Sequence, residues 1–151
     1  MELPQEISDF IEEKTEMANT ALPWNYPSID NFNDFQAGYR YNAITLESLI
    51  GEKGGFDENW FVICSNYFDD PFFIDISEIE NGFPIYYAQH GAGSWTPIKI
   101  SGNINEFSNQ LKEIKEIEEN RDLLLEKLKI EFDLENELWK EVYESTLEDE
   151  E

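Results

Sequence analysis

Residues 59–95 read NWFVICSNYFDDPFFIDISEIENGFPIYYAQHGAGSW, and this stretch is the strongest indication of how the chain folds. Short segments rich in aromatic and β-branched residues alternate in it with turn signals. The segments are 60–65, 72–76 and 85–88, and the turns are Asp69-Asp70-Pro71 and Asn81-Gly82. Such alternation is typical of a β-meander, in which consecutive strands pair with one another. The stretch therefore predicts the centre of a sheet that buries at least one face.

The N-terminal flank is predicted to hold two helices. Apolar residues at helical spacing after Pro4 predict a first helix that ends near Asn19. Ser28 is a suitable N-cap for a second, short helix that Gly38 ends. Residues 39–46 are then predicted to be extended, and residues 50–59 to form a loop.

The C-terminal flank is predicted to begin with a last strand at 96–100 and to continue as helix. Asn103 and Glu106 form a variant of the capping box at the start of this helix. Beyond Arg121, apolar residues follow a heptad-like seam. They are Leu125, Leu128, Phe132, Trp139 and Val142. Two interpretations stay open: amphipathic helices packed on the domain, or an arm that forms a coiled-coil homodimer.

Length and composition are those of one ordinary domain. The chain has 151 residues, of which 40% are hydrophobic and 15% aromatic, and this is ample material for a core. We expect an α+β domain over residues 1–120, with a mainly antiparallel sheet of about five or six strands flanked by N-terminal and C-terminal helices. Residues 121–151 are expected to form an acidic, amphipathic helical extension.

Acidity is extreme and spread along the chain. The formal net charge is −24, and residues 1–105 carry 17 acidic and 4 basic side chains, whereas residues 106–151 carry 17 and 6. Such a surface repels nucleic acid and anionic membranes, so neither is an expected partner. A basic protein partner is the natural inference, and solubility alone is the alternative.

No targeting or membrane segment is evident. The acidic start MELPQEISDF is unlike a signal peptide, and no run reaches the roughly 18 apolar residues of a membrane span. We expect a cytoplasmic protein. The single cysteine, Cys64, lies in an apolar segment and is expected to be a buried small hydrophobe rather than a reactive thiol.

The sequence contains few side chains in patterns suited to metal binding or catalysis. His90 is the only histidine, which excludes metal sites that need two histidines. A Cys64–His90 dyad and an enzyme built on Asp75 and His90 are the weakest interpretations. We expect no enzymatic activity, no cofactor and no metal.

Aromatic residues supply the candidates for binding. Trp95 follows the flexible Gly91-Ala92-Gly93 turn beside His90, and it is predicted to be either an interface anchor or a core residue. Strand alternation places Phe72 and Phe73 on opposite faces, so one of them is either an exposed patch or covered by a helix.

The middle of the chain resembles the SUKH superfamily, the Smi/Knr-type fold. The resemblance rests on Asp69, Pro71, Ile74, Asp75, Pro84, Ile85, Tyr86, Tyr87 and His90, with residues 104–111 similar to the closing helix of the family. It covers roughly residues 1–115. It implies an immunity protein, an antitoxin that binds a bacterial toxin, often a basic nuclease, and occludes it. A non-enzymatic regulatory scaffold of the Smi/Knr type is the alternative. The candidate partner-binding residues are Asp69, Asp70, His90 and Trp95.

Overall fold

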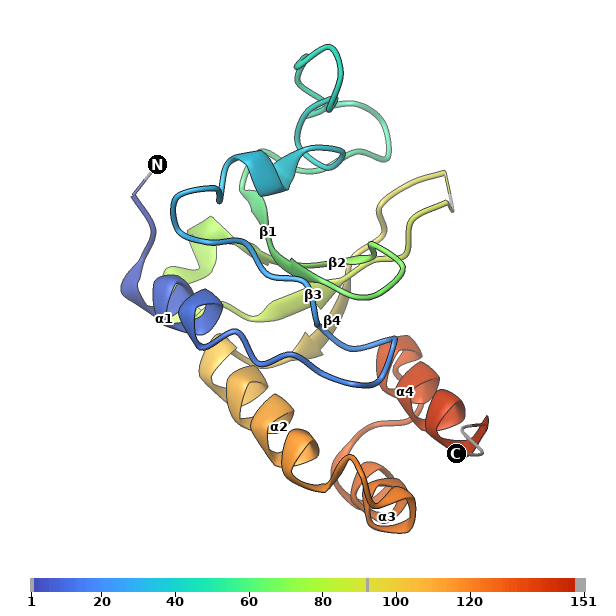
Figure 1. The fold of residues 1–151 in the computed structure, drawn as a ribbon. Coiled ribbons are helices and arrows are strands. Elements are labelled where there is room, and N and C mark those ends of the chain that lie inside the picture. Colours follow the sequence, from blue (N-terminus) through green and yellow to red (C-terminus); the bar gives the residue numbers. More distant parts are fainter. Residues whose placement is uncertain (1, 92, 149–151) are drawn as a thin grey trace.

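Four consecutive strands make the central sheet. They are β1 (Trp60–Ser65), β2 (Pro71–Asp75), β3 (Ile85–Tyr87) and β4 (Ile98–Ser101), each antiparallel to the next in the order β1-β2-β3-β4. This computed structural model describes residues 2–91 and 93–148. The α+β class and the antiparallel meander are confirmed (Figure 1). The described residues hold four strands rather than the expected five or six. Residues 149–151 of the predicted extension, and Ala92 of the predicted loop, lie outside the described residues.

Helices flank the sheet at both ends of the chain. The α-helices are α1 (Gln5–Glu13), α2 (Ile104–Ile117), α3 (Arg121–Glu131) and α4 (Glu137–Glu148), and the short 3-10 helices are η1 (Asp34–Gln36) and η2 (Ile76–Asn81). Helix α1 ends well before the expected Asn19, because Lys14 adopts a left-handed conformation and its N–H donates to the Phe10 carbonyl. At α2, Asn103 Oδ1 accepts the N–H of Glu106 at 2.8 Å, as the capping pattern predicts.

The segment after Gly38 is where the sequence interpretation fails most clearly. Residues 39–46 form turns instead of the predicted extended segment, and η1 is shorter than the predicted helix. The physical reason lies at Asn42, whose Oδ1 accepts the N–H groups of Ile44 and Thr45 at 2.8 and 2.9 Å. An asparagine side chain that binds the backbone two residues ahead replaces strand pairing with a turn.

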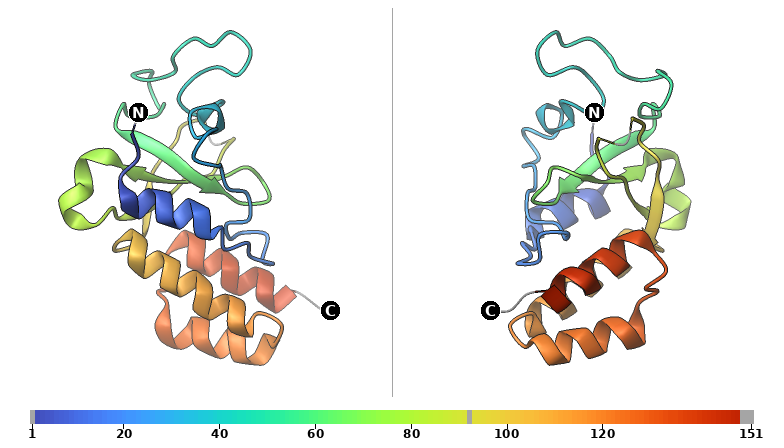
Figure 2. Two further views of the ribbon diagram at one scale, coloured as in Figure 1. Left: turned by 60° about the vertical axis from the view of Figure 1, so that its left-hand side comes forward. Right: turned by 90° about the vertical axis from the view of Figure 1, so that its right-hand side faces the viewer.

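One face of the sheet is covered by helices. Helices α1 and α2 lie side by side beneath it, with α3 and α4 alongside (Figures 1 and 2). Phe107 of α2 stacks on Phe72 of β2 and on Phe10 of α1, with ring centroids 5.9 Å apart in both pairs. All three rings are buried, so this face holds the larger of two hydrophobic clusters.

Helices α3 and α4 pack on that same cluster. Leu128, Trp139 and Val142 of the heptad-like seam are buried in it, while Leu125 and Phe132 are half-buried. The indole Nε1 of Trp139 also donates to the Ile100 carbonyl of β4 at 3.0 Å. Four of the five seam residues, all except Leu125, therefore pack in or against the core of their own chain.

The other face of the sheet is covered by loops. Phe73 points to this side and is fully buried, packed against Phe56 and Trp60 with ring centroids 5.0 and 5.1 Å apart. The second cluster is thus not an exposed patch. None of the described residues that form it or pack on it belongs to an α-helix, although Phe35 comes from η1. Irregular segments before β1 and after β3 enclose it with aromatic side chains.

Two side chains from the η1 region bind the edge of β1 that does not pair with β2. Gln36 is buried, and its amide accepts the Val62 N–H at 2.8 Å and donates to the Val62 carbonyl at 2.9 Å, as a neighbouring strand would. One turn later, Arg40 donates to the Trp60 carbonyl at 2.6 Å and stacks on the Phe61 ring. These contacts fix the η1 segment beside the sheet and block edge pairing with another chain.

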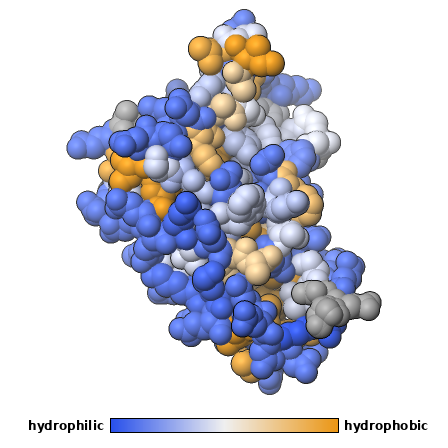
Figure 3. Space-filling view, in the orientation of Figure 1, coloured by the Kyte–Doolittle hydropathy of each residue, from blue (hydrophilic) through white to orange (hydrophobic). Residues whose placement is uncertain are grey.

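The face drawn in Figure 3 is mostly hydrophilic, with apolar atoms gathered at the end of the projecting loop and in a few smaller spots. Within the described ranges, every helix is too short or too polar to cross a membrane.

We predict that Trp139→Ala lowers the free energy of unfolding by about 3–5 kcal/mol, because it empties a buried site and leaves the Ile100 carbonyl without its donor. Urea unfolding measures the change. The control is Leu123→Ala on the exposed side of α3, with an expected effect below about 0.5 kcal/mol. Conversion of a dimer to a monomer with unchanged stability would contradict the prediction and support the coiled-coil arm.

Candidate partner-binding groove

The turn between β1 and β2 is built around Asn66. Its Oδ1 accepts the N–H groups of Phe68 and Asp70 at 2.9 and 3.0 Å, and its own N–H donates to the Asp70 carbonyl. Asp69, at the corner, has a φ of 66°. These bonds turn the buried carboxyl group of Asp70 toward the end of β3 and expose its neighbour Asp69.

Asp70 joins this turn to the chain that leaves β3. Its Oδ1 accepts the His90 N–H at 2.9 Å and contacts His90 Nδ1 at 2.5 Å, while its Oδ2 accepts the Tyr87 hydroxyl at 3.1 Å. Asp70 is only 6% exposed, so these donors replace water around the carboxylate. Burial and the nearby carboxylate raise the pKa of Tyr87, which keeps its hydroxyl a donor.

Asp70 holds the His90 side chain at one ring nitrogen, Nδ1. A carboxylate only accepts, so Nδ1 carries the proton in this contact and Nε2 is the nitrogen available to a ligand. The side chain is 54% exposed. It therefore presents an oriented ring to the surface.

A groove of about 530 Å³ opens beside His90. Its walls come from the η1 segment, from the β1–β2 turn and from the loop after β3. The lining residues are Asn25, Asp34, Phe35, Ala37, Gly38, Tyr39, Ser65, Asp69, His90 and Trp95. Two exposed carboxylates and no lysine or arginine line it, so the groove suits a cationic group.

The aromatic wall of the groove belongs to the second cluster. Trp95 is half-buried, and its ring lies 5.6 Å from Tyr39 and 5.7 Å, edge-on, from Phe56. The Tyr39 hydroxyl donates to the Asp69 carbonyl at 2.7 Å. This bond ties the aromatic wall to the acidic turn.

Gly54 brings the loop before β1 against the loop after β3. The Trp95 N–H donates to the Gly54 carbonyl at 2.7 Å. A Cβ at Gly54 would stand 2.8 Å from the Ser94 Cβ, and its φ of 77° is left-handed, so only glycine fits. The two loops thus form one continuous surface.

The four candidate residues lie around this one groove. Asp69, His90 and Trp95 line it, whereas Asp70 lies beneath it and orients His90. Whether they contact a partner stays a prediction. Sequence reasoning missed Asp34, Gln36 and Tyr39, because it assigned these residues to a helix and a strand and gave them no role.

The structure separates Cys64 and Asp75, the other residues considered for catalysis, from His90. Cys64 is fully buried in the cluster between the sheet and the helices, and burial raises its thiol pKa well above the ordinary value, so it forms no dyad with His90. Asp75 lies at the other end of β2 from the Asp70 turn, where its carboxylate caps η2 through the Ser77 N–H at 2.9 Å.

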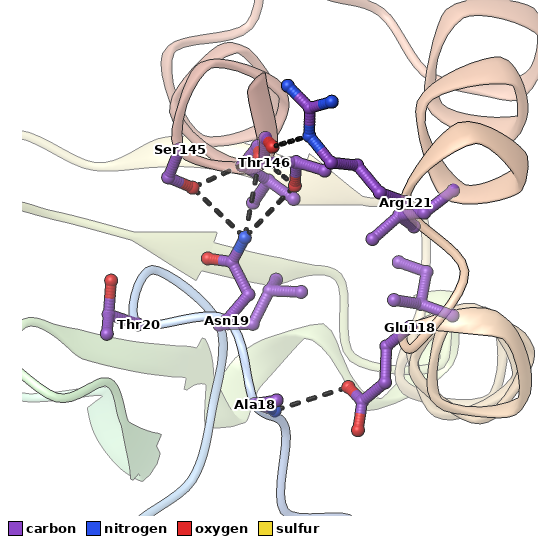
Figure 4. A pocket seen from close by; sticks show the side chains of 11 residues that line it. Ala18, Asn19, Thr20, Glu118, Arg121, Ser145 and Thr146 are labelled. Atoms are coloured by element: carbon purple, nitrogen blue, oxygen red, sulfur yellow. Dashed lines mark hydrogen bonds between the residues drawn. The ribbon is translucent and has the colours of Figure 1, made fainter. Parts of the chain in front are cut away.

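A second cavity, of about 300 Å³, lies where residues 18–22 meet the ends of α2 and α4 (Figure 4). Asn19 donates to Ser145 Oγ at 3.0 Å, and Arg121 donates to the Thr146 carbonyl at 3.0 Å. Because arginine near the C-terminal carbonyls of a helix stabilises it, these polar groups serve the docking of α4.

Searches of protein-family models, of curated proteins and of solved structures found no match to this chain. Within residues 2–91 and 93–148, no group of three or more His, Cys, Asp or Glu side chains is placed to hold a metal ion.

We predict that Asp70→Ala lowers the free energy of unfolding by about 2–3 kcal/mol, because it leaves the His90 N–H and the Tyr87 hydroxyl without their acceptor. The matched control is Asp69→Asn, where asparagine keeps the left-handed backbone and stability stays within about 0.5 kcal/mol. Thermal and urea unfolding measure both. If Asp70→Ala changes the free energy of unfolding as little as Asp69→Asn does, the Asp70 contacts contribute nothing to stability.

Trp95→Ala is predicted to lower stability by about 2 kcal/mol, less than a fully buried tryptophan costs, because the ring is half-buried among Tyr39 and Phe56. Calorimetry of the free protein measures the loss. Trp24→Ala, at an exposed tryptophan, is the control and should cost under about 1 kcal/mol. A loss above about 4 kcal/mol would make Trp95 a core residue.

Proposed function

We propose that this protein is an immunity protein, an antitoxin of the SUKH type that binds a basic bacterial toxin domain and occludes its active site. The observation that carries the proposal is the groove at His90, in which carboxylates stand beside an aromatic wall on a chain of charge −24. The sequence resemblance over residues 69–90 supports the same class. A cytoplasmic location and a non-catalytic mechanism belong to this proposal.

Groove chemistry favours a lysine or arginine of the partner. A cation placed against the Trp95 and Tyr39 rings gains a cation–π interaction, and the Asp34 and Asp69 carboxylates flank the same space. A toxin that acts on nucleic acid carries such cations where it binds phosphates. Carboxylates that take the place of phosphates would then block the substrate.

The regulatory scaffold is the second candidate, and one observation favours it. Trp24 and two residues of the β1–β2 turn, Tyr67 and Phe68, form an exposed aromatic patch, with ring centroids 6.2 and 5.7 Å apart in the Trp24–Tyr67 and Tyr67–Phe68 pairs. An exposed aromatic patch marks a protein contact. A protein with two separate contact surfaces suits a scaffold that joins two partners.

The deciding experiment is co-expression with the basic toxin domain that this proposal expects an adjacent gene to encode. Growth rescue together with a 1:1 complex on a sizing column supports the immunity function. A folded protein that neither rescues growth nor forms the complex contradicts it. Rescue should persist with Glu119→Gln, on the connection between α2 and α3, and weaken with Asp34→Asn combined with Asp69→Asn.

We predict that the association rate with this toxin domain falls on the order of tenfold between low and physiological salt, because electrostatic steering is screened over a Debye length of about 8 Å. Stopped-flow fluorescence measures it. The Asp34→Asn, Asp69→Asn double variant should associate more slowly at low salt and lose part of the salt dependence. An association rate that salt leaves unchanged would contradict the electrostatic mechanism.

A further inference from the structure

The loop that projects farthest from the sheet ends in two aliphatic side chains. It is the excursion at the top of Figure 1, and apolar atoms gather at its end in Figure 3. Ile44 is 92% exposed and Leu46 is 70% exposed. A single exposed aliphatic residue is ordinary, but two within three residues of one another at the tip of a projection make that tip apolar.

The backbone of this tip is held rigidly. Besides the two bonds to Asn42 Oδ1, the Leu46 N–H donates to the Asn42 carbonyl at 2.8 Å, and the Asn42 N–H donates to the Glu47 carbonyl at 2.8 Å. The tip is therefore preformed, and little conformational entropy remains to be lost when it binds.

The fold does not require leucine at position 46. Its φ is 64°, a left-handed conformation that glycine and asparagine adopt easily and leucine does not. The side chain buries little surface in return for this strain. Strain kept at an exposed residue points to a role in binding.

The charge of this loop and its contact with the groove indicate what kind of surface the tip binds. Glu47 and Glu52 are exposed in this loop, and with Asp57 and Glu58 they outnumber the two basic residues of the segment 40–58, Arg40 and Lys53. The base of the loop is tied to the groove through the Trp95–Gly54 bond. An apolar tip on an acidic stem, continuous with an acidic groove, is complementary to an apolar pocket with a basic rim.

We propose that residues 42–47 are a preformed plug that enters an apolar pocket of the basic toxin domain while the groove at His90 binds the rim of that pocket. This inference rests on the proposed function and adds how occlusion is achieved. The plug supplies contact area that slows dissociation, whereas the carboxylates of the groove accelerate association.

Affinity and stability measured together test the plug. The probe is the catalytically inactivated toxin domain from the adjacent gene, immobilised for binding kinetics. Ile44→Ser and Leu46→Gly should each weaken binding at least about tenfold through faster dissociation. Leu46→Gly should leave the melting temperature unchanged or raise it, because glycine relieves the left-handed backbone. The matched control is Ile130→Ser on α3, which is 73% exposed and should bind as the unmodified chain does.

Each outcome bears on the proposal. Binding within about twofold of the unmodified chain for both tip variants overturns the plug and leaves the immunity function standing. A lower melting temperature for Leu46→Gly overturns it too, because Leu46 would then serve the fold. If the free chain dimerises and Ile44→Ser makes it monomeric, the tip binds a second copy and the proposal is wrong. If the unmodified chain does not bind the toxin domain, both proposals fall.

Discussion

Phe72 and Phe73 are adjacent in β2, point to opposite faces of the sheet and are both fully buried. Both faces must therefore be covered, and the chain covers them by different means. Helices α1, α2 and α4 provide the first covering, with backbone hydrogen bonds satisfied internally. The second covering is made of irregular segments, whose backbone groups need partners supplied by particular side chains and by close approach. Most of the features around the groove follow from that second requirement.

The loop covering is held by a few specific contacts. Gln36 pairs with the edge of β1 through its side-chain amide, and Gly54 lets two loops approach. Asp70 joins the β1–β2 turn to His90. Each contact satisfies a backbone or buried polar group and, in the same step, orients a residue of the groove. Stability and site geometry are therefore coupled on this face.

Regular periodicity explains what the sequence could predict. The strands at 60–65 and 85–87 and the cap of α2 at Asn103 were found because local patterns dictate them. The prediction of an extended segment at residues 39–46 was wrong because hydrogen bonds to the Asn42 side chain form a turn there. Such local bonds leave no periodic signal in the sequence. Asp69, His90 and Trp95 were identified individually, but their meeting with Asp34 depends on tertiary contacts made by Gln36, which looks like any surface glutamine in the sequence.

The order of the strands also bears on the kinetics of folding. Each strand of the meander pairs with its sequence neighbour, so the sheet forms with short loops and little loss of chain entropy. The contact between Asn19 and Ser145 spans 126 residues and closes almost the whole chain. We expect the meander to appear early in the folding reaction and the joining of residues 18–22 to α4 to come last. In the native state that joint should accordingly be the first to open, exposing the end of the helical layer while the sheet and its loop covering stay intact.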